Sequence, residues 1–172
     1  MSDSLTEHFG GIDIYLFDQI LRGRIAPGMR VLDAGCGGGR NLVYLLRAGY
    51  DVVAVDADPL AVEATRALAV SLAPRLPSSN FAVEPVEGMT IPDASVDVII
   101  SSAVLHFARD RSHFEAMVRR MWRALVPGGL LFCRLAASTG LEDRVVPVGG
   151  GRYALPDGSE RYTFTRSGRI LD

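Results

Sequence analysis

Short apolar runs alternate with amphipathic stretches along the first 135 residues of the chain. The apolar runs that are typical of strands cover residues 29–33, 51–55, 80–83, 96–102 and 130–135. Helical periodicity covers residues 12–21, 41–48, 59–73 and 112–125. This alternation predicts an α/β fold with a doubly wound, mainly parallel sheet. We expect its core strands in the spatial order 3-2-1-4-5, with helices on both faces.

Two helices carry clear start signals. Asp58 can cap free backbone amides, and Pro59 suits the first helical position because it has no amide to leave unpaired. Ser112 and Glu115 form a capping-box pattern at the start of the helix at residues 112–125. An apolar stripe on this helix predicts the face that packs in the core, with Phe114, Met117, Val118, Met121, Trp122 and Leu125. The opposite face is expected to point to solvent, with Arg119, Arg120 and Arg123.

Residues 138–172 differ from the rest because they are rich in glycine and have no long apolar run. Residues 152–155 and 161–165 are compatible with two short strands around a turn at residues 156–159. A chain of 172 residues is long enough for one sizeable core and short for two. We therefore expect residues 1–172 to form a single domain.

Composition removes several classes of protein from consideration. Hydrophobic residues make up 48% of the chain, so it is not disordered, and its formal net charge of −2 gives no electrostatic case for nucleic acid or an anionic membrane. No apolar run reaches the roughly 18 residues of a membrane span. Four acidic residues among the first thirty are unlike a signal peptide, which predicts a cytoplasmic protein. Two distant cysteines suggest neither a disulfide framework nor a metal site.

A glycine-rich loop at residues 35–39 joins the first strand to the first helix. Glycines there let the backbone turn tightly and approach a ligand, and the ligand crevice of a parallel sheet lies at the carboxyl ends of its strands. Asp56 ends the second strand, 21 positions after Gly35, where a carboxylate can accept both hydroxyl protons of a ribose. The sequence therefore predicts a cofactor that carries a nucleoside.

Two residues near the loop separate the candidate cofactors. A nicotinamide dinucleotide pattern would need a glycine where Arg40 stands, and an apolar residue where Asp33 stands. A carboxylate beside the loop would repel a pyrophosphate, whereas it suits the amino group and sulfonium of S-adenosylmethionine (SAM). A nicotinamide-dependent oxidoreductase is therefore the less favoured alternative.

Taken together, these segments resemble the motifs of class I SAM-dependent methyltransferases. Residues 31–39 resemble the first motif of that family, and residues 53–56 resemble its acidic ribose-binding motif. The fourth-strand motif and the turn before the fifth strand resemble residues 92–99, 101–106 and 125–129. The resemblance implies a Rossmann-like fold, SAM as cofactor and a small-molecule methyl acceptor. More finely, the amino-terminal helix and residues 153–159 are similar to the small tellurite-resistance-type branch.

The resemblance also implies a set of cofactor contacts. They are expected from the loop and strand ends, at Asp33, Ala34, Gly35, Cys36, Gly37, Gly39, Asp56, Ala57 and Ser101. Members of the family often hold the adenine amino group with an acidic residue at the position of Pro85, so adenine is expected at the backbone near Val86 and at Glu87. The chain also ends before the two further strands that usually complete the family's sheet, so we expect these strands to be shortened or missing.

Methyl transfer makes modest demands on the protein. The sulfonium already makes its methyl group electrophilic, so the protein mainly holds an acceptor in line with the methyl–sulfur bond. A general base is needed only for an acceptor that is protonated at the working pH. His106 is the candidate near the expected methyl position, with a structural role as the alternative, and His8 and His113 have weaker cases. A SAM- or nucleotide-binding module without catalysis is the rival hypothesis for the whole chain.

Overall fold

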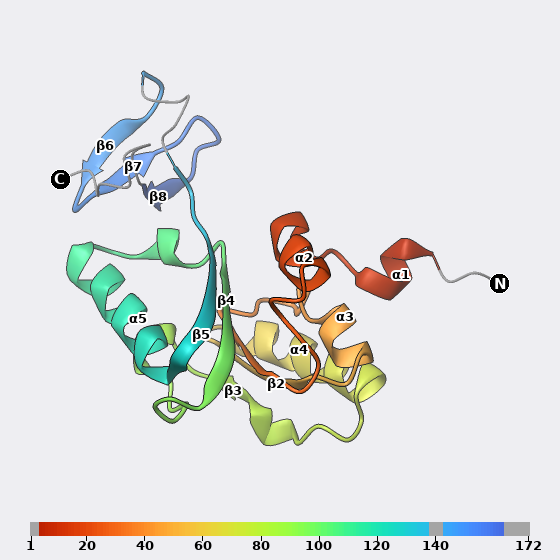
Figure 1. The fold of residues 1–172 in the computed structure, drawn as a ribbon. Coiled ribbons are helices and arrows are strands. Elements are labelled where there is room, and N and C mark those ends of the chain that lie inside the picture. The colour runs from red at the N-terminus through yellow and green to blue at the C-terminus, as the bar shows by residue number, and fades with distance from the viewer. Residues whose placement is uncertain (1–3, 138–142, 164–172) are drawn as a thin grey trace.

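The computed structural model describes residues 4–137 and 143–163, drawn as a ribbon in Figure 1. The strands of its larger sheet are β1 (Arg30–Ala34), β2 (Asp51–Asp56), β3 (Phe81–Val83), β4 (Val96–Ser102) and β5 (Leu125–Arg134). The α-helices are α1 (Leu5–Phe9), α2 (Ile14–Leu21), α3 (Val43–Arg47), α4 (Pro59–Leu72) and α5 (Arg111–Ala124). Short 3-10 turns are η1 (Ser78–Asn80), η2 (Val86–Gly88) and η3 (Leu105–Phe107).

The larger sheet is parallel throughout and has the order β3-β2-β1-β4-β5. Its centre is β1, where Val31 pairs with Val52 on one side and with Val98 on the other. The predicted Rossmann-like order is therefore confirmed. Because every strand runs the same way, the loops that follow β1, β2, β3 and β4 gather at one edge of the sheet.

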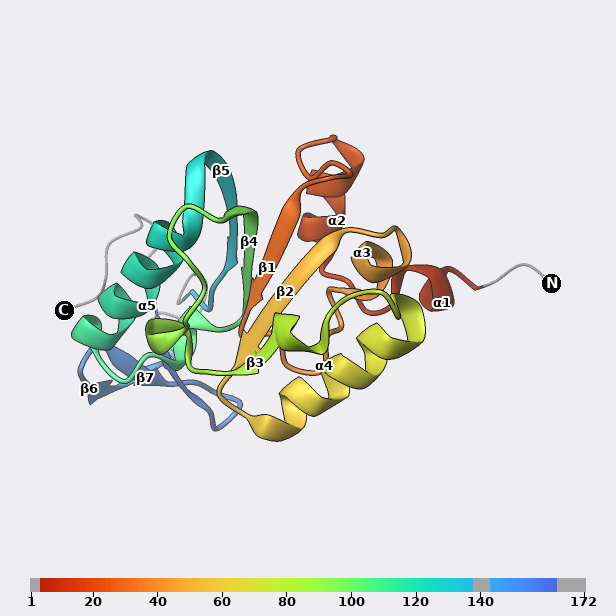
Figure 2. The ribbon, with the colours of Figure 1, turned by 90° about the horizontal axis from the view of Figure 1, so that it is seen from below.

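Successive strand residues point to opposite faces, and this divides the core into two clusters. Val31 and Ile100 lie in the cluster that α2, α3 and α4 cover, whereas Leu32 and Ile99 lie in the cluster that α5 covers. Figures 1 and 2 show α5 alone on one side of the sheet, with α2, α3 and α4 on the other. Burial on both faces is why these strands read as continuous apolar runs in the sequence.

The helix starts are only partly as predicted. At α4, Asp58 accepts a hydrogen bond from the Leu60 amide and Pro59 is the first helical residue, which confirms that signal. The helix expected at residues 41–48 is shorter, since α3 covers Val43–Arg47. Asn41 lies in the turn before α3, where its Oδ1 accepts a hydrogen bond from the amide of Asp13 and so links the amino-terminal segment to this turn.

Helix α5 corrects three expectations. Its cap is Asp110, whose carboxylate accepts from the amide of His113, so the Ser112 capping box is wrong. Trp122 is 66% exposed and lies outside the buried stripe. Arg120 is not a solvent-facing side chain, because its guanidinium donates to the carbonyl oxygens of Met89 and Ile91. These carbonyls lie in the loop after η2, so Arg120 fastens that loop to α5.

The remaining strands form a separate antiparallel sheet with β6 (Val146–Gly149), β7 (Arg152–Ala154) and β8 (Glu160–Tyr162). The two predicted strands correspond to β7 and β8, although residues 164 and 165 lie outside the described ranges. No sequence signal marked β6. This sheet docks on α5 through Tyr162, whose ring stacks on Phe114 with centroids 5.3 Å apart.

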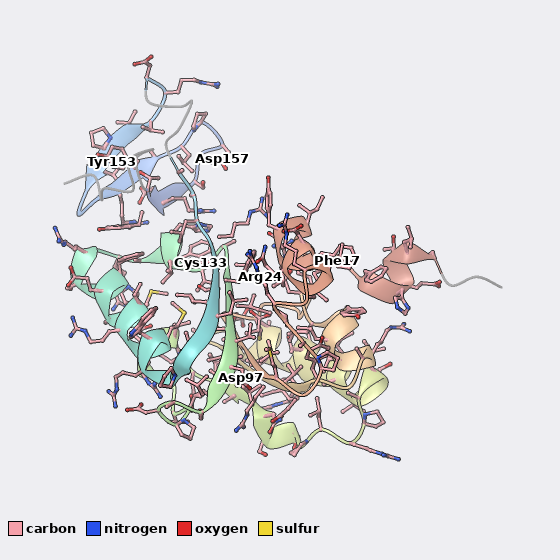
Figure 3. The ribbon with its side chains drawn as sticks, viewed as in Figure 1. Phe17, Arg24, Asp97, Cys133, Tyr153 and Asp157 are labelled. Atoms are coloured by element: carbon pink, nitrogen blue, oxygen red, sulfur yellow. The ribbon has the colours of Figure 1, made fainter. Side chains whose placement is uncertain are left out.

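Figure 3 shows where the three-stranded sheet lies relative to the larger one. Tyr153 and Asp157 of the three-stranded sheet lie at the opposite end of the molecule from Asp97, near the start of β4. The three-stranded sheet therefore stands beyond the carboxyl ends of β4 and β5. None of the helices within residues 4–137 and 143–163 is both long and apolar enough to span a bilayer.

Candidate functional site

A cavity of about 650 Å³ opens at the carboxyl ends of the parallel strands. This volume lies within the range of about 300–1,000 Å³ that small-molecule sites occupy. Seven of the predicted site residues line it, namely Gly35, Cys36, Gly37, Asp56, Ala57, Val86 and Glu87. The described lining does not include the other five, namely Asp33, Ala34, Gly39, Ser101 and His106.

Steric contacts explain why the ends of the loop need glycine, whereas its middle is open. Gly35 has φ +85°, and a Cβ there would lie 2.5 Å from Cγ2 of Val104. Gly39 has φ +78°, and a Cβ there would lie 3.1 Å from the hydroxyl of Thr65 on α4. A Cβ at Gly37 would meet no atom within 4 Å, so this part of the loop faces open space. The loop is thus packed closely at both ends and leaves room for a ligand in the middle.

Asp56 is held at the cavity wall by two backbone amides. Its Oδ2 accepts from Gly37 at 2.8 Å, and its Oδ1 accepts from Asp58 at 2.9 Å. Each carboxylate oxygen has a further lone pair, so the carboxylate can still accept protons from a ligand. The end of β2 and the glycine loop therefore form one rigid unit around this side chain.

Asp33 lies behind the loop, only 1% exposed. Within the described part of the chain its Oδ2 has no hydrogen-bond partner. Burial, and then the nearby charge of Asp56, raise the pKa of Asp33 to about 8, although Arg40 acts in the opposite direction. From its place at a strand end, this carboxylate was expected to be a charge at the crevice. The structure instead places a buried carboxyl group there that is mostly protonated at neutral pH.

The other predicted residues near the loop are structural neighbours of the cavity. Ala34 is fully buried at the end of β1, and Ser101 is fully buried in β4, where it pairs in register with Cys133. Burial raises the pKa of Cys36 to about 12, and the Thr65 hydroxyl lies 3.6 Å from its sulfur. Since a thiol with such a pKa stays protonated, Cys36 is unsuited to act as a nucleophile.

The two histidines near the cavity lie differently relative to its lining. His106 is outside the described lining, and its Nδ1 accepts from the amide of Ala136 at 3.2 Å. Burial, and then Arg161, lower the pKa of His106. His113 lines the cavity, and its Nε2 lies 2.9 Å from Oε1 of Glu87. Nothing in the local sequence marks His113, because its partner comes from a distant segment.

The chain matches a family model described as "Methyltransferase domain" over residues 32–133. The ubiquinone biosynthesis O-methyltransferase of Methylocella silvestris is 29% identical over 159 residues, which cover 90% of this chain and 57% of that protein. The chain spans about half the length of the curated relatives it matches.

Solved structures show the same fold. A TehB-like SAM-dependent methyltransferase from Corynebacterium glutamicum has a TM-score of 0.54 and 29% identity, with 68% of this chain and 60% of that chain covered. The 1,6-didemethyltoxoflavin-N1-methyltransferase of Burkholderia thailandensis has a TM-score of 0.66 and 22% identity, with 95% of this chain and 65% of that chain covered. That enzyme was solved with 1,6-didemethyltoxoflavin and S-adenosylhomocysteine bound.

Proposed function

Because the chain belongs to the methyltransferase domain family, we propose that it transfers a methyl group from SAM to a small-molecule acceptor. The observation that carries this proposal is the fixed carboxylate of Asp56, which bridges the glycine loop and the end of β2 at the wall of the cavity. A carboxylate at this place suits the two hydroxyl groups of a ribose.

The described residues fit the chemistry of SAM at three places. Asp56 would accept from the ribose hydroxyls, and the open middle of the loop at Gly37 gives the cofactor room. Asp33 lies outside the cavity lining and keeps a buried oxygen without a partner in the described chain, and it would suit the cationic end of SAM only if binding ionises it. The adenine would lie against the backbone near Val86 and against Glu87. The other predicted loop contacts belong to the same proposal.

Bound SAM supplies a methyl group that is electrophilic without help from the protein. The chain's own part is to exclude water and to hold the acceptor, for which the apolar side chains of Val104, Phe107 and Met117 line the cavity. Phe107 is 58% exposed and lies at the side nearest the three-stranded sheet, with the guanidinium of Arg161 4.6 Å from its ring. We place the acceptor on this side. An acceptor that ionises near neutral pH needs no general base.

The acceptor class is proposed from the named relatives. By their names, one relative is an O-methyltransferase of ubiquinone biosynthesis and the other is an N1-methyltransferase of 1,6-didemethyltoxoflavin. We also propose membership of the tellurite-resistance-type branch, supported by the 29% identity to the TehB-like structure. The single domain, the cytoplasmic location and a role for His106 stay predictions from the sequence.

Two measurements test the proposed function. Calorimetric titration with SAM, S-adenosylhomocysteine and NAD, each alone, should show binding of the first two only. Incubation with methyl-labelled SAM and a panel of hydroquinones, phenols and nitrogen heterocycles should then label at least one acceptor. Binding of SAM without transfer to any acceptor would favour the non-catalytic module, and binding of NAD alone would overturn the assignment of the cofactor.

A further inference from the structure

The two histidines beside the cavity are held in a form that cannot take up a proton. Nδ1 of His113 accepts a hydrogen bond from the amide of Arg109 at 3.1 Å, and Nδ1 of His106 accepts one from the amide of Ala136 at 3.2 Å. A ring nitrogen that accepts carries no proton, so the single proton of each neutral ring lies on Nε2. Neither imidazole then has a free lone pair, and neither can act as a general base while these bonds are kept.

The other described residues of the acceptor side supply no base either. Its apolar part consists of Val104, Phe107 and Met117. The hydroxyl of Ser102 accepts from the guanidinium of Arg40 at 3.4 Å. The carboxylates in the described lining are Asp56 and Glu87, which the proposed function assigns to the ribose and the adenine. An acceptor with a hydroxyl or ring N–H group must therefore lose its proton to water before it attacks the methyl group.

Two arginines bring positive charge to the same side. Arg109 lines the cavity, as does Phe107, and the guanidinium carbon of Arg161 lies 4.6 Å from the centroid of the Phe107 ring. Within residues 4–137 and 143–163, neither arginine forms an ion pair. A guanidinium has several N–H donors, of which Arg161 uses one on the carbonyl of Glu160. Both side chains can therefore still bind an anion.

Two carboxylates interact electrostatically with these arginines, but both are already used by local hydrogen bonds. Oδ1 of Asp110 accepts from the amide of His113 at 2.8 Å, and Oδ1 of Asp157 accepts from the amide of Ser159 at 2.9 Å. The sulfonium of bound SAM would add a further positive charge beside the acceptor. The acceptor side thus favours an anion over a neutral molecule or a cation.

We propose that the acceptor is bound and methylated as an organic anion, with Arg109 and Arg161 holding its charge in place of a general base. This inference rests on the proposed function, because it needs SAM in the cavity. The anionic oxygen or nitrogen forms a bond to the methyl carbon, and the electron pair of the broken methyl–sulfur bond returns to sulfur. Anion and sulfonium are both neutralised, and no proton moves within the site. The acceptor class is therefore phenols, ring N–H compounds and carboxylic acids that ionise near neutral pH.

The first test measures binding with para-nitrophenol, because its phenolate absorbs visible light and the neutral phenol does not. Added to the chain in complex with S-adenosylhomocysteine, it should bind as the phenolate. It should bind more tightly than its uncharged methyl ether, para-nitroanisole, by about 10-fold or more, the effect of one hydrogen bond to a charged group. Absorbance titration gives both the affinity and the ionisation state of the bound probe.

Variants of the arginines assign this preference to particular side chains. Arg109→Gln should lower it by about 10-fold, whereas Arg109→Lys keeps the charge and should recover part of it. Arg161→Gln should cause a smaller loss, because Arg161 lies behind the Phe107 ring. Arg119→Gln removes an exposed arginine of α5 that is outside the cavity lining, and it should leave the preference unchanged.

The second test uses the direction of a pH effect on turnover. For an acceptor taken up as its anion, kcat/KM rises with pH until the acceptor's own pKa in solution is passed, so the rise should come at lower pH for para-nitrophenol than for the less acidic para-chlorophenol. If a base of the chain removed the proton, kcat/KM would instead fall above that pKa, because only the neutral phenol has a proton to give. Titration of Asp33 and other groups of the free chain affects both acceptors alike and cancels in the comparison.

The histidines are tested by replacement with asparagine, whose Oδ1 can accept the same backbone amide as Nδ1. Both His106→Asn and His113→Asn should keep kcat within about 10-fold of the wild-type value, whereas loss of a general base costs about 100- to 10,000-fold. A loss of that size in either folded variant would identify a base and overturn the inference.

The remaining outcomes separate this inference from the proposed function. If the wild-type chain binds neither SAM nor S-adenosylhomocysteine, the proposed function itself is wrong. If S-adenosylhomocysteine binds but para-nitrophenol binds no more tightly than para-nitroanisole, or binds as the neutral phenol, the inference alone is overturned. It is overturned as well if the labelled methyl group is transferred only to acceptors without an acidic proton.

Discussion

The two sheets of this chain are stabilised in different ways. Strand β4 of the larger sheet has Val98, Ile99 and Ile100 fully buried, with helices on both faces. In the three-stranded sheet every residue of β6 is exposed, and Tyr162 is the fully buried side chain of β8. The larger sheet is therefore covered by helices on both faces, whereas the smaller sheet contributes Tyr162 to the core cluster that α5 covers.

The two sheets also border different sides of the proposed site, the cofactor side and the acceptor side. The residues proposed to hold SAM lie on the larger sheet and its loops, around Asp56 and Glu87. The side proposed for the acceptor is bordered by Phe107, against which β8 places Arg161. A family that keeps one cofactor and changes acceptors needs such a separation, because loops and small appendages vary more easily than a doubly buried sheet.

The largest expected effect comes from the centre of the larger sheet. Ile99→Ala deletes a fully buried side chain in β4 and should lower the free energy of unfolding by about 2–5 kcal/mol. Val148→Ala makes a matched truncation in β6, where the side chain is 46% exposed, and should change it by less than about 0.5 kcal/mol. Urea unfolding measures both. Equal losses would mean that the two sheets share one core.

The next effect concerns the cofactor side of the cavity. Asp56→Ala should weaken SAM binding by about 1.5–3 kcal/mol, because the proposed hydrogen bonds to the ribose are lost. Asp51→Ala is the matched control, since it removes a carboxylate from the opposite end of β2, where Asp51 lies 3.4 Å from Arg30. Calorimetry should show SAM affinity unchanged in the control. If SAM affinity is unchanged in Asp56→Ala, Asp56 does not bind the ribose hydroxyls.

The sequence predicted the larger sheet and its loop because their signals are local. A buried strand, a glycine turn and Asp56 at a strand end can each be recognised within a few residues. The pairing of His113 with Glu87 depends on the packing of η2 against α5, which no local pattern encodes. The prediction that Trp122 packs in the core was wrong for a related reason. Helical spacing indicates which side of the helix is apolar but not how wide the buried stripe is.

The smaller sheet was only half predictable. Strands β7 and β8 flank a turn with Asp157 and Gly158, which is a recognisable signal. Strand β6 contains Pro147 and has no buried residue, so neither propensity nor alternation marks it. The burial of Asp33 was missed as well, because the sequence places it at a strand end without showing how deeply the loop covers it.

A pH-dependent effect, about 1.4 kcal/mol per pH unit at most, is expected from Asp33. Its folded-state pKa of about 8 lies above the ordinary value of 3.8, so between these values the folded chain keeps a proton that the unfolded chain releases. Stability contributed by this group is therefore full below pH 3.8 and declines as the pH rises towards 8. Asp33→Asn should flatten this decline in urea unfolding measured between pH 5 and 8.

Asp33 also predicts a proton released on binding. If the cationic end of SAM favours the ionised carboxylate, binding at pH 6.5 should release up to about one proton, and Asp33→Asn should release less. Calorimetry in buffers with different ionisation enthalpies counts these protons. SAM should lose more affinity than S-adenosylhomocysteine in the variant, because only SAM carries the sulfonium. If the variant and the wild-type chain release the same number of protons, Asp33 does not interact with the bound cofactor.

The smallest effect on cofactor binding is expected at the anchor of the smaller sheet. Tyr162→Ala removes the ring that stacks on Phe114 and fills the space beside Gly151, so β7 and β8 should lose their protection from hydrogen exchange. Urea unfolding should also show a loss of about 3 kcal/mol, because Tyr162 is fully buried in the core cluster that α5 covers. Affinity for S-adenosylhomocysteine should stay within about twofold, while kcat/KM for the acceptor falls, since Arg161 is no longer held against Phe107.

The control for truncation in the same sheet is Tyr153→Ala, which shortens a half-buried tyrosine of β7 and should preserve the protection of β7 and β8 from hydrogen exchange. A parallel loss of S-adenosylhomocysteine affinity in Tyr162→Ala would show that the smaller sheet also shapes the cofactor side.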